Sequence, residues 1–129
     1  MTQPSPYKNT GGLIRIIRAF GYSLQGLGAA WRHEVAFRQE VLLTIILIPL
    51  GLWLGNTAGE RLLLASMPVL VLIVELINSA IEALADAIST DHHPMLGRAK
   101  DIGSAAVLLA LLLAGAAWAT VLVPRWWPG

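Results

Sequence analysis

Apolar residues fall into three long runs along the chain, and short polar segments separate them. The segment from Val41 to Gly59 and the segment from Ile102 to Pro124 contain no charged residue, and the run from Leu62 to Ile88 contains only a few polar ones. About 20 apolar residues are needed to cross the ~30 Å hydrocarbon core of a bilayer. The pattern therefore predicts three membrane-spanning helices, over residues 36–55, 62–88 and 102–124.

A shorter amphipathic helix is predicted ahead of the first span, over residues 13–30. Most large apolar residues from Leu13 to Leu27 recur at spacings of three, four and seven, whereas Arg15 and Arg18 lie off that face. This arrangement is typical of a basic helix that lies on a membrane surface. Residues 1–12, which include prolines and glycines, are predicted to form a loose tail of a single membrane domain, 1–129.

Composition supports the membrane interpretation. Of the 129 residues, 56% are hydrophobic and 13% are charged, against roughly 45–50% and about 25% in soluble domains. So short a chain cannot bury that much apolar surface in a core of its own. The net charge of +1 offers no basic stripe for a nucleic acid, and the lack of cysteine excludes disulfides and cysteine-bound metals.

The basic residues are distributed unevenly about the predicted spans. Arg61 and Arg125 lie on one side. The other side carries Lys8, Arg15, Arg18, Arg32, Arg38, Arg98 and Lys100. Because positive charge accumulates on the cytoplasmic side, we expect a cytoplasmic amino terminus and a carboxyl terminus outside. The polar loop predicted over 89–101 is then cytoplasmic too.

The second predicted span carries polar residues on a single face. At ~100° per residue, all of them fall within about 100° of arc; they are Glu75, Asn78, Ser79, Glu82 and Asp86. At 1.5 Å per residue from Leu62, Glu75 lies roughly 20 Å along the span and Glu82 about 30 Å along it. An acid at such depth is costly and usually marks a functional site.

More than one chemistry suits this acidic face. Carboxylates close to water are hard oxygen ligands suited to Mg²⁺, and the deeper Glu75 can accept a proton from a hydroxyl group. A proton- or cation-conducting subunit would use the same face, whereas a membrane scaffold would have no use for Glu75. The chain contains neither the phosphate-binding loop of nucleoside triphosphatases nor the motifs of protein kinases.

Four segments of the chain resemble the prokaryotic diacylglycerol kinases. Two of them surround the acidic face and the loop that follows it: Glu75-x-x-Asn78-Ser79-Ala80-Ile81-Glu82-x-x-x-Asp86 and Gly97-Arg98-Ala99-Lys100-Asp101-x-Gly103-Ser104-Ala105-Ala106. The other two come earlier: Arg15-Ile-Ile-Arg-Ala-x-Gly21-Tyr22-Ser23 and Ala30-Trp31-x-x-Glu34-x-Ala36-Phe37-Arg38-Gln39-Glu40. The likeness extends from about Gly12 to Trp118.

This resemblance implies an all-α integral membrane enzyme of the bacterial inner membrane. Each subunit of a homotrimer would have three membrane helices and a surface helix. The enzyme would transfer the γ-phosphoryl group of ATP, with Mg²⁺ as cofactor, to the hydroxyl of diacylglycerol, giving phosphatidic acid. Undecaprenol kinases share the core motif, but the longer surface-helix signature favours diacylglycerol.

The resemblance also implies roles for individual residues. Glu75 matches the general base, which meets the lipid substrate, and Asn78 matches a residue that supports the site. Glu34 and Glu82 match the residues that bind the metal–nucleotide. Five further residues match neighbours of the nucleotide: Arg15, Tyr22, His93, Lys100 and Asp101. Ser104 matches a residue near the lipid hydroxyl. A conducting subunit would need neither Glu34 nor the segment 97–101.

Overall fold

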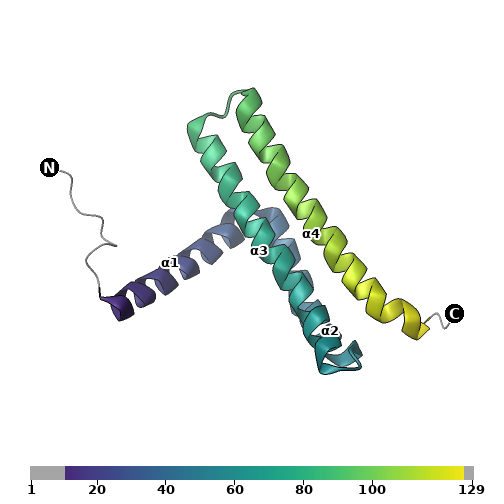
Figure 1. The fold of residues 1–129 in the computed structure, drawn as a ribbon. Helices are drawn as coiled ribbons and strands as arrows, with labels where there is room; N and C mark the ends of the chain where they lie inside the picture. Colours follow the sequence, from purple (N-terminus) through teal and green to yellow (C-terminus); the bar gives the residue numbers. More distant parts are fainter. Residues whose placement is uncertain (1–10, 127–129) are drawn as a thin grey trace. The chain divides into compact units, whose positions relative to one another are not determined.

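The computed structural model describes residues 11–126, and it describes side chains from residue 11 to residue 124. Four α helices follow one another in this part of the chain: α1 (Gly12–His33), α2 (Val35–Leu54), α3 (Ala58–Ile88) and α4 (Pro94–Trp126) (Figure 1). The all-α fold and the four helices predicted from the sequence are confirmed. Most of the tail predicted over residues 1–12 lies outside the described residues.

The chain divides into two compact units, of which the first ends at Glu34 and the second begins at Val35. The first unit contains α1, whose large apolar side chains, such as Leu13, Ile16 and Phe20, are exposed. Its last turn holds Arg32 and His33, where positive charge is favourable beside the helix carbonyls. Glu34 follows with extended backbone and donates its N–H to the carbonyl of Ala30 at 2.9 Å.

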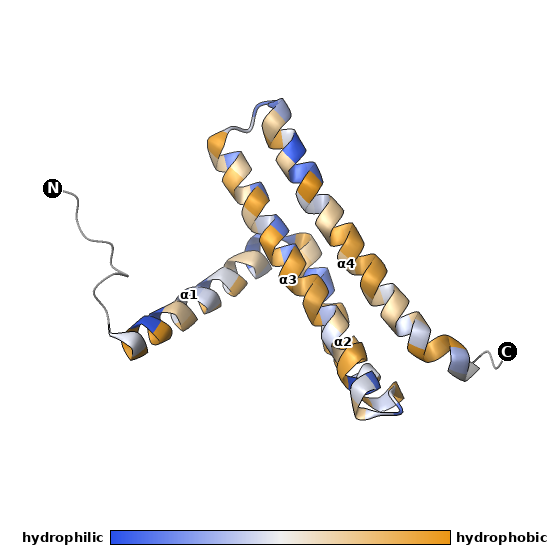
Figure 2. Cartoon of the chain, viewed as in Figure 1, coloured by the Kyte–Doolittle hydropathy of each residue, from blue (hydrophilic) through white to orange (hydrophobic). Residues whose placement is uncertain are grey.

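The second unit consists of α2, α3 and α4, and each of them is long and apolar enough to cross a membrane. Helix α3 packs against both α2 and α4, and the chain reverses direction at each connection (Figure 1). Figure 2 shows that apolar residues dominate the length of these helices. Polar residues gather in the first turns of α4 and near the two connections (Figure 2).

The turn between α2 and α3 is closed by side-chain hydrogen bonds. Thr57 caps α3, its hydroxyl accepting the N–H of Glu60 at 3.1 Å. The carboxylate of Glu60 in turn accepts the N–H of Asn56 at 3.1 Å. This reciprocal arrangement satisfies N–H groups that have no partner within the helix. Helix α3 consequently begins at Ala58, four residues earlier than the predicted start at Leu62.

Helices α2 and α3 approach each other closely at Gly51. A side chain at this position would lie 2.7 Å from Cβ of Leu64 on α3, so only glycine permits this packing. Leu64 is fully buried, and it forms the centre of an apolar cluster with Leu54 and Val121. This cluster joins all three helices at the end of the unit that contains the 55–57 turn.

Helix α4 begins at Pro94, eight residues before the predicted start at 102, so the predicted loop over 89–101 is reduced to 89–93. Proline suits the first position of a helix because its fixed φ is already helical and its missing N–H would have no partner there. The first two turns of α4 include the charged residues Arg98 and Lys100. The hydrophobic pattern alone therefore does not predict that these turns are helical. The helical extension carries Lys100 and Asp101.

Much of the apolar surface of the three spans is not covered by this chain. In the most apolar part of each helix, the buried share is 33% for α3, 17% for α2 and 11% for α4. Exposed leucines and isoleucines lie along α2 and α4, among them Leu42, Ile46, Leu109 and Leu112. This surface is suited to lipid chains or to other protein subunits.

Candidate functional site

The polar face of α3 passes from buried to exposed along the helix. Glu75, Asn78 and Ser79 are buried, with 6%, 7% and 8% of their surface exposed. Glu82 is half-buried and Asp86 is exposed. Since α2 and α4 both pack on α3, these residues lie partly between the helices. Glu75 forms the deep end of the face, and the 89–93 connection lies beyond its exposed end.

Asn78 connects this face to helix α4. Its amide Nδ2 donates to Oε1 of Glu82 at 3.3 Å. Its amide oxygen is buried and has no hydrogen-bond partner among the described residues. That oxygen lies against Gly103 of α4, at the place where any other residue would put its Cβ atom. Asn78 therefore lies between Glu82 on its own helix and the backbone of α4.

Glu40 of α2 is an acidic residue for which no role is predicted from the sequence. One of its carboxylate oxygens is buried without a hydrogen-bond partner in the described part of the chain, and its charge repels that of Glu75. Glu40 and Glu75 therefore lie within electrostatic range of each other on two helices that pack together. Its position in the sequence is the one sign that could have drawn attention to it, because Glu40 is the last charged residue before the apolar run of α2.

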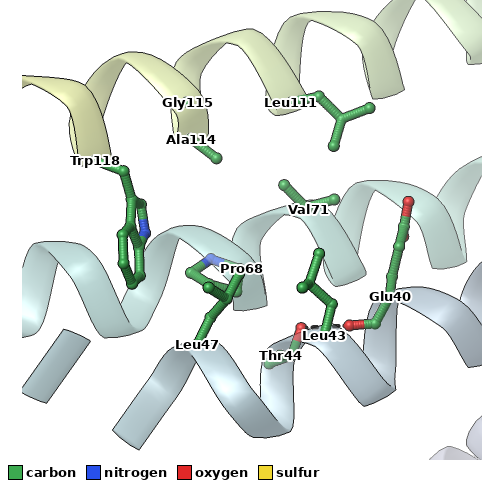
Figure 3. A pocket seen from close by; sticks show the side chains of 10 residues that line it. All are labelled: Glu40, Leu43, Thr44, Leu47, Pro68, Val71, Leu111, Ala114, Gly115 and Trp118. Carbon is green, nitrogen blue, oxygen red and sulfur yellow. Dashed lines mark hydrogen bonds between the residues drawn. The ribbon is translucent and has the colours of Figure 1, made fainter. Parts of the chain in front are cut away.

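An apolar hollow of about 280 Å³ lies between α2, α3 and α4. Figure 3 shows Glu40 at one end of it, Trp118 at the other and Val71 and Pro68 along its wall. The Thr44 hydroxyl is bound to the backbone carbonyl of Glu40 at 2.6 Å. The Glu40 carboxylate is therefore the main polar group of the hollow.

Lys100 and His93 have defined partners near the start of α4. The ammonium of Lys100 forms an ion pair with Oδ1 of Asp86 at 2.6 Å, which joins the polar ends of α3 and α4. His93 accepts the backbone N–H of Met95 on its Nδ1 at 3.2 Å, and its carbonyl accepts the N–H of Gly97 at 2.9 Å. His93 thus caps α4, a structural role that the sequence did not predict.

The other predicted site residues are more dispersed. Asp101 and Ser104 are exposed on the same helix as Lys100. Arg15 and Tyr22 are exposed on α1, in the first unit, and Glu34 terminates that helix. The structure thus gathers Glu75, Asn78 and Glu82 on one helix face. A shared site that also includes Arg15, Tyr22 and Glu34 stays a prediction.

The carboxylates of the second unit fit a metal that arrives with a nucleotide. The described part of the chain contains no group of three or more histidine, aspartate or glutamate side chains able to hold an ion by itself. Mg²⁺ is commonly held by one or two carboxylates together with substrate phosphates and water. Glu82, half-buried and hydrogen-bonded to Asn78, has the hard oxygen donors that such a site uses.

Fold and site together define a small multi-pass membrane protein with a buried carboxylate, that of Glu75, on the face of α3 that lies partly between its spans. A sequence profile described as prokaryotic diacylglycerol kinase matches residues 21–122. The chain is 52% identical to the diacylglycerol kinase of Pseudomonas aeruginosa over 93% of its own length and 98% of the relative's. It is 50% identical to that of Escherichia coli, over 88% of this chain and 93% of the other. The diacylglycerol kinase of Helicobacter pylori is 40% identical, over 87% and 88%.

The chain belongs to the prokaryotic diacylglycerol kinase family. This confirms the resemblance that the four sequence segments carry, and it confirms the enzyme class expected from them. The conducting-subunit alternative, which rests on the acidic face alone, has no comparable support.

Proposed function

We propose that this diacylglycerol kinase uses Glu75 as the general base that accepts the proton of the lipid hydroxyl. The observation that carries this assignment is the burial of Glu75 on a face that continues to the exposed end of α3. A base at this place is within the membrane part of the helix, where a lipid can reach it. The same face leads toward water, where a nucleotide can reach it.

Binding of MgATP is assigned to the polar end of this face. Glu82 and Glu34 would hold Mg²⁺, and Asn78 would orient Glu82. When bound, the ion neutralises charge on the phosphates of the nucleotide. Lys100 serves as a point cation for the same phosphates. The remaining nucleotide contacts are proposed for Arg15, Tyr22, His93 and Asp101.

The lipid is proposed to approach along the apolar hollow. Its walls suit acyl chains, and its polar end, Glu40, lies within electrostatic range of Glu75. Ser104 is proposed to lie near the lipid hydroxyl. The product of the transfer is phosphatidic acid, because the hydroxyl oxygen displaces ADP from the γ-phosphorus.

The assembly and its orientation are also part of the proposal. The uncovered apolar surface of α2 and α4 supports a homotrimer surrounded by lipid. The distribution of basic residues supports a bacterial inner-membrane enzyme with a cytoplasmic amino terminus and an outer carboxyl terminus.

The experiment that tests the base assignment is Glu75→Gln. Purified protein is supplied with Mg²⁺, γ-labelled ATP and either diacylglycerol or undecaprenol. The wild-type chain should label diacylglycerol in preference to undecaprenol. A general base typically accelerates a reaction by about 10²–10⁴-fold. Glu75→Gln should therefore phosphorylate diacylglycerol at least about 10²-fold more slowly, and it should still assemble in detergent.

Asp91→Asn is the matched control, because Asp91 is exposed in the 89–93 connection and has no proposed role. Near-normal turnover of Glu75→Gln would contradict the base assignment. Preferential labelling of undecaprenol by the wild-type chain would contradict the proposed lipid.

A further inference from the structure

Gly103 of α4 faces the acidic helix α3 at Asn78. Among the glycines of the described chain, it is the one whose added Cβ atom would collide with a polar side chain of the acidic face. The atom in the way is the amide oxygen of Asn78. Gly103 itself is buried, so the space is not available from another direction.

The position of the Asn78 amide depends on this contact. With glycine at 103, the amide oxygen occupies the space that a side chain at this position would fill. The opposite edge of the amide then directs Nδ2 to Oε1 of Glu82. Because the amide oxygen is buried and has no hydrogen-bond partner within residues 11–124, the backbone of α4 at Gly103 provides its environment.

We propose that Gly103 is a positioning residue that fixes the Asn78 amide, and through it the Glu82 carboxylate, in the orientation that receives the metal of the nucleotide. The inference rests on the metal role proposed for Glu82. A methyl group at position 103 displaces the end of a side chain rather than a backbone. The Asn78 amide would therefore rotate, and the helices need not separate.

The variant that tests this is Gly103→Ala. Removing the partner that orients a metal ligand typically costs about 10–100-fold in metal affinity or activity. Gly103→Ala should therefore need roughly tenfold more Mg²⁺ to reach half-maximal diacylglycerol phosphorylation. Alanine stabilises a helix relative to glycine, and this gain opposes the cost of rotating the Asn78 amide. The unfolding temperature in detergent without ligand should therefore change little.

A binding measurement accompanies the assay. Stabilisation by Mg²⁺ and a non-hydrolysable ATP analogue is followed by thermal unfolding, since a ligand stabilises the folded state according to its affinity. The Mg²⁺ concentration needed for half of this stabilisation should rise by the same factor in Gly103→Ala. Gly26→Ala is the matched control, because it makes the same change inside a helix, α1, at a position where a Cβ atom meets nothing within 4 Å.

The pathway of the effect is tested in an Asn78→Ala background. If Gly103 acts through Asn78, Gly103→Ala should add no further change in the Mg²⁺ dependence of binding once the amide is gone. A further change in that background would contradict the proposal. Should Gly103→Ala alone fail to fold, the double variant has room for the methyl group and should fold; failure of both would contradict the proposal.

Two other outcomes separate this inference from the function on which it rests. If Glu82→Gln shifts the Mg²⁺ requirement but Gly103→Ala behaves like the wild-type chain, positioning by Gly103 is wrong and the metal role of Glu82 stands. If Glu82→Gln leaves the Mg²⁺ requirement unchanged, the metal role of Glu82 is itself wrong. A loss of stability in Gly103→Ala with an unchanged Mg²⁺ requirement assigns Gly103 to packing alone and overturns the inference.

Discussion

The indole N–H of Trp118 on α4 donates to the backbone carbonyl of Leu64 on α3, with 3.1 Å between nitrogen and oxygen. In a regular helix this carbonyl would accept the N–H of the residue four positions later. That residue is Pro68, which has no N–H. Trp118 therefore satisfies the acceptor that a proline inside a membrane helix leaves free, and it joins the two helices by doing so.

Replacing Trp118 with phenylalanine should destabilise the protein. The change keeps an aromatic ring but removes the donor, and an unsatisfied buried carbonyl costs about 1–3 kcal/mol. Unfolding in detergent, followed by temperature or denaturant, measures the loss. In a Pro68→Ala background the helix supplies its own N–H, so Trp118→Phe should cost much less there. Equal costs in the two backgrounds would show that the hydrogen bond is not the cause.

The ion pair between Lys100 and Asp86 should contribute little to stability. Both side chains are substantially exposed, 40% for Lys100 and 53% for Asp86, and exposed ion pairs are weak. Asp86→Asn should leave the unfolding temperature nearly unchanged and retain most of the activity. Lys100→Met should also stay folded, but it should raise the KM for ATP at least tenfold, because a phosphate cation is lost. Similar kinetic losses in the two variants would contradict a separate role for Lys100.

The absence of cysteine from the chain allows the orientation to be tested without background labelling. Asn56 lies in the turn between α2 and α3, and Thr90 lies in the connection between α3 and α4; both are exposed. With a cytoplasmic amino terminus, Asn56→Cys should react with a membrane-impermeant maleimide in cells whose inner membrane is intact. Thr90→Cys should react only after that membrane is permeabilised. The reverse pattern would invert the proposed orientation.

The spans were predictable because each exposes apolar side chains to its surroundings and so needs a nearly continuous apolar sequence. The arc of polar residues from Glu75 to Asp86 was predictable for a related reason, since helical geometry alone places residues three and four apart on one face. The hydrogen bond from Asn78 to Glu82 is an instance of that spacing.

The contacts between helices were not predictable in this way. Lys100 meets Asp86, and Trp118 meets Leu64, only because α3 and α4 pack in one particular register. Glu40 lies at the end of a segment dense in charges, where the sequence alone does not separate a solvated acid from one facing another helix. The early start of α4 was not predictable from hydropathy, because Gly97, Arg98 and Lys100 interrupt the apolar pattern of its first turns.

The lengths of the helices bear on where the chemistry can take place. At 1.5 Å per residue, the 20 residues of α2 span about 30 Å, whereas the 31 of α3 and the 33 of α4 span roughly 46 and 50 Å. The hydrocarbon core is only ~30 Å thick. Two adjacent helices thus have length to spare, and Glu82, Asp86 and Lys100 lie toward the end where the two helices are connected. Glu82 and Lys100 are consequently carried on rigid rods rather than on a flexible loop. Their height above the hydrocarbon is set by the thickness of the bilayer that surrounds the protein.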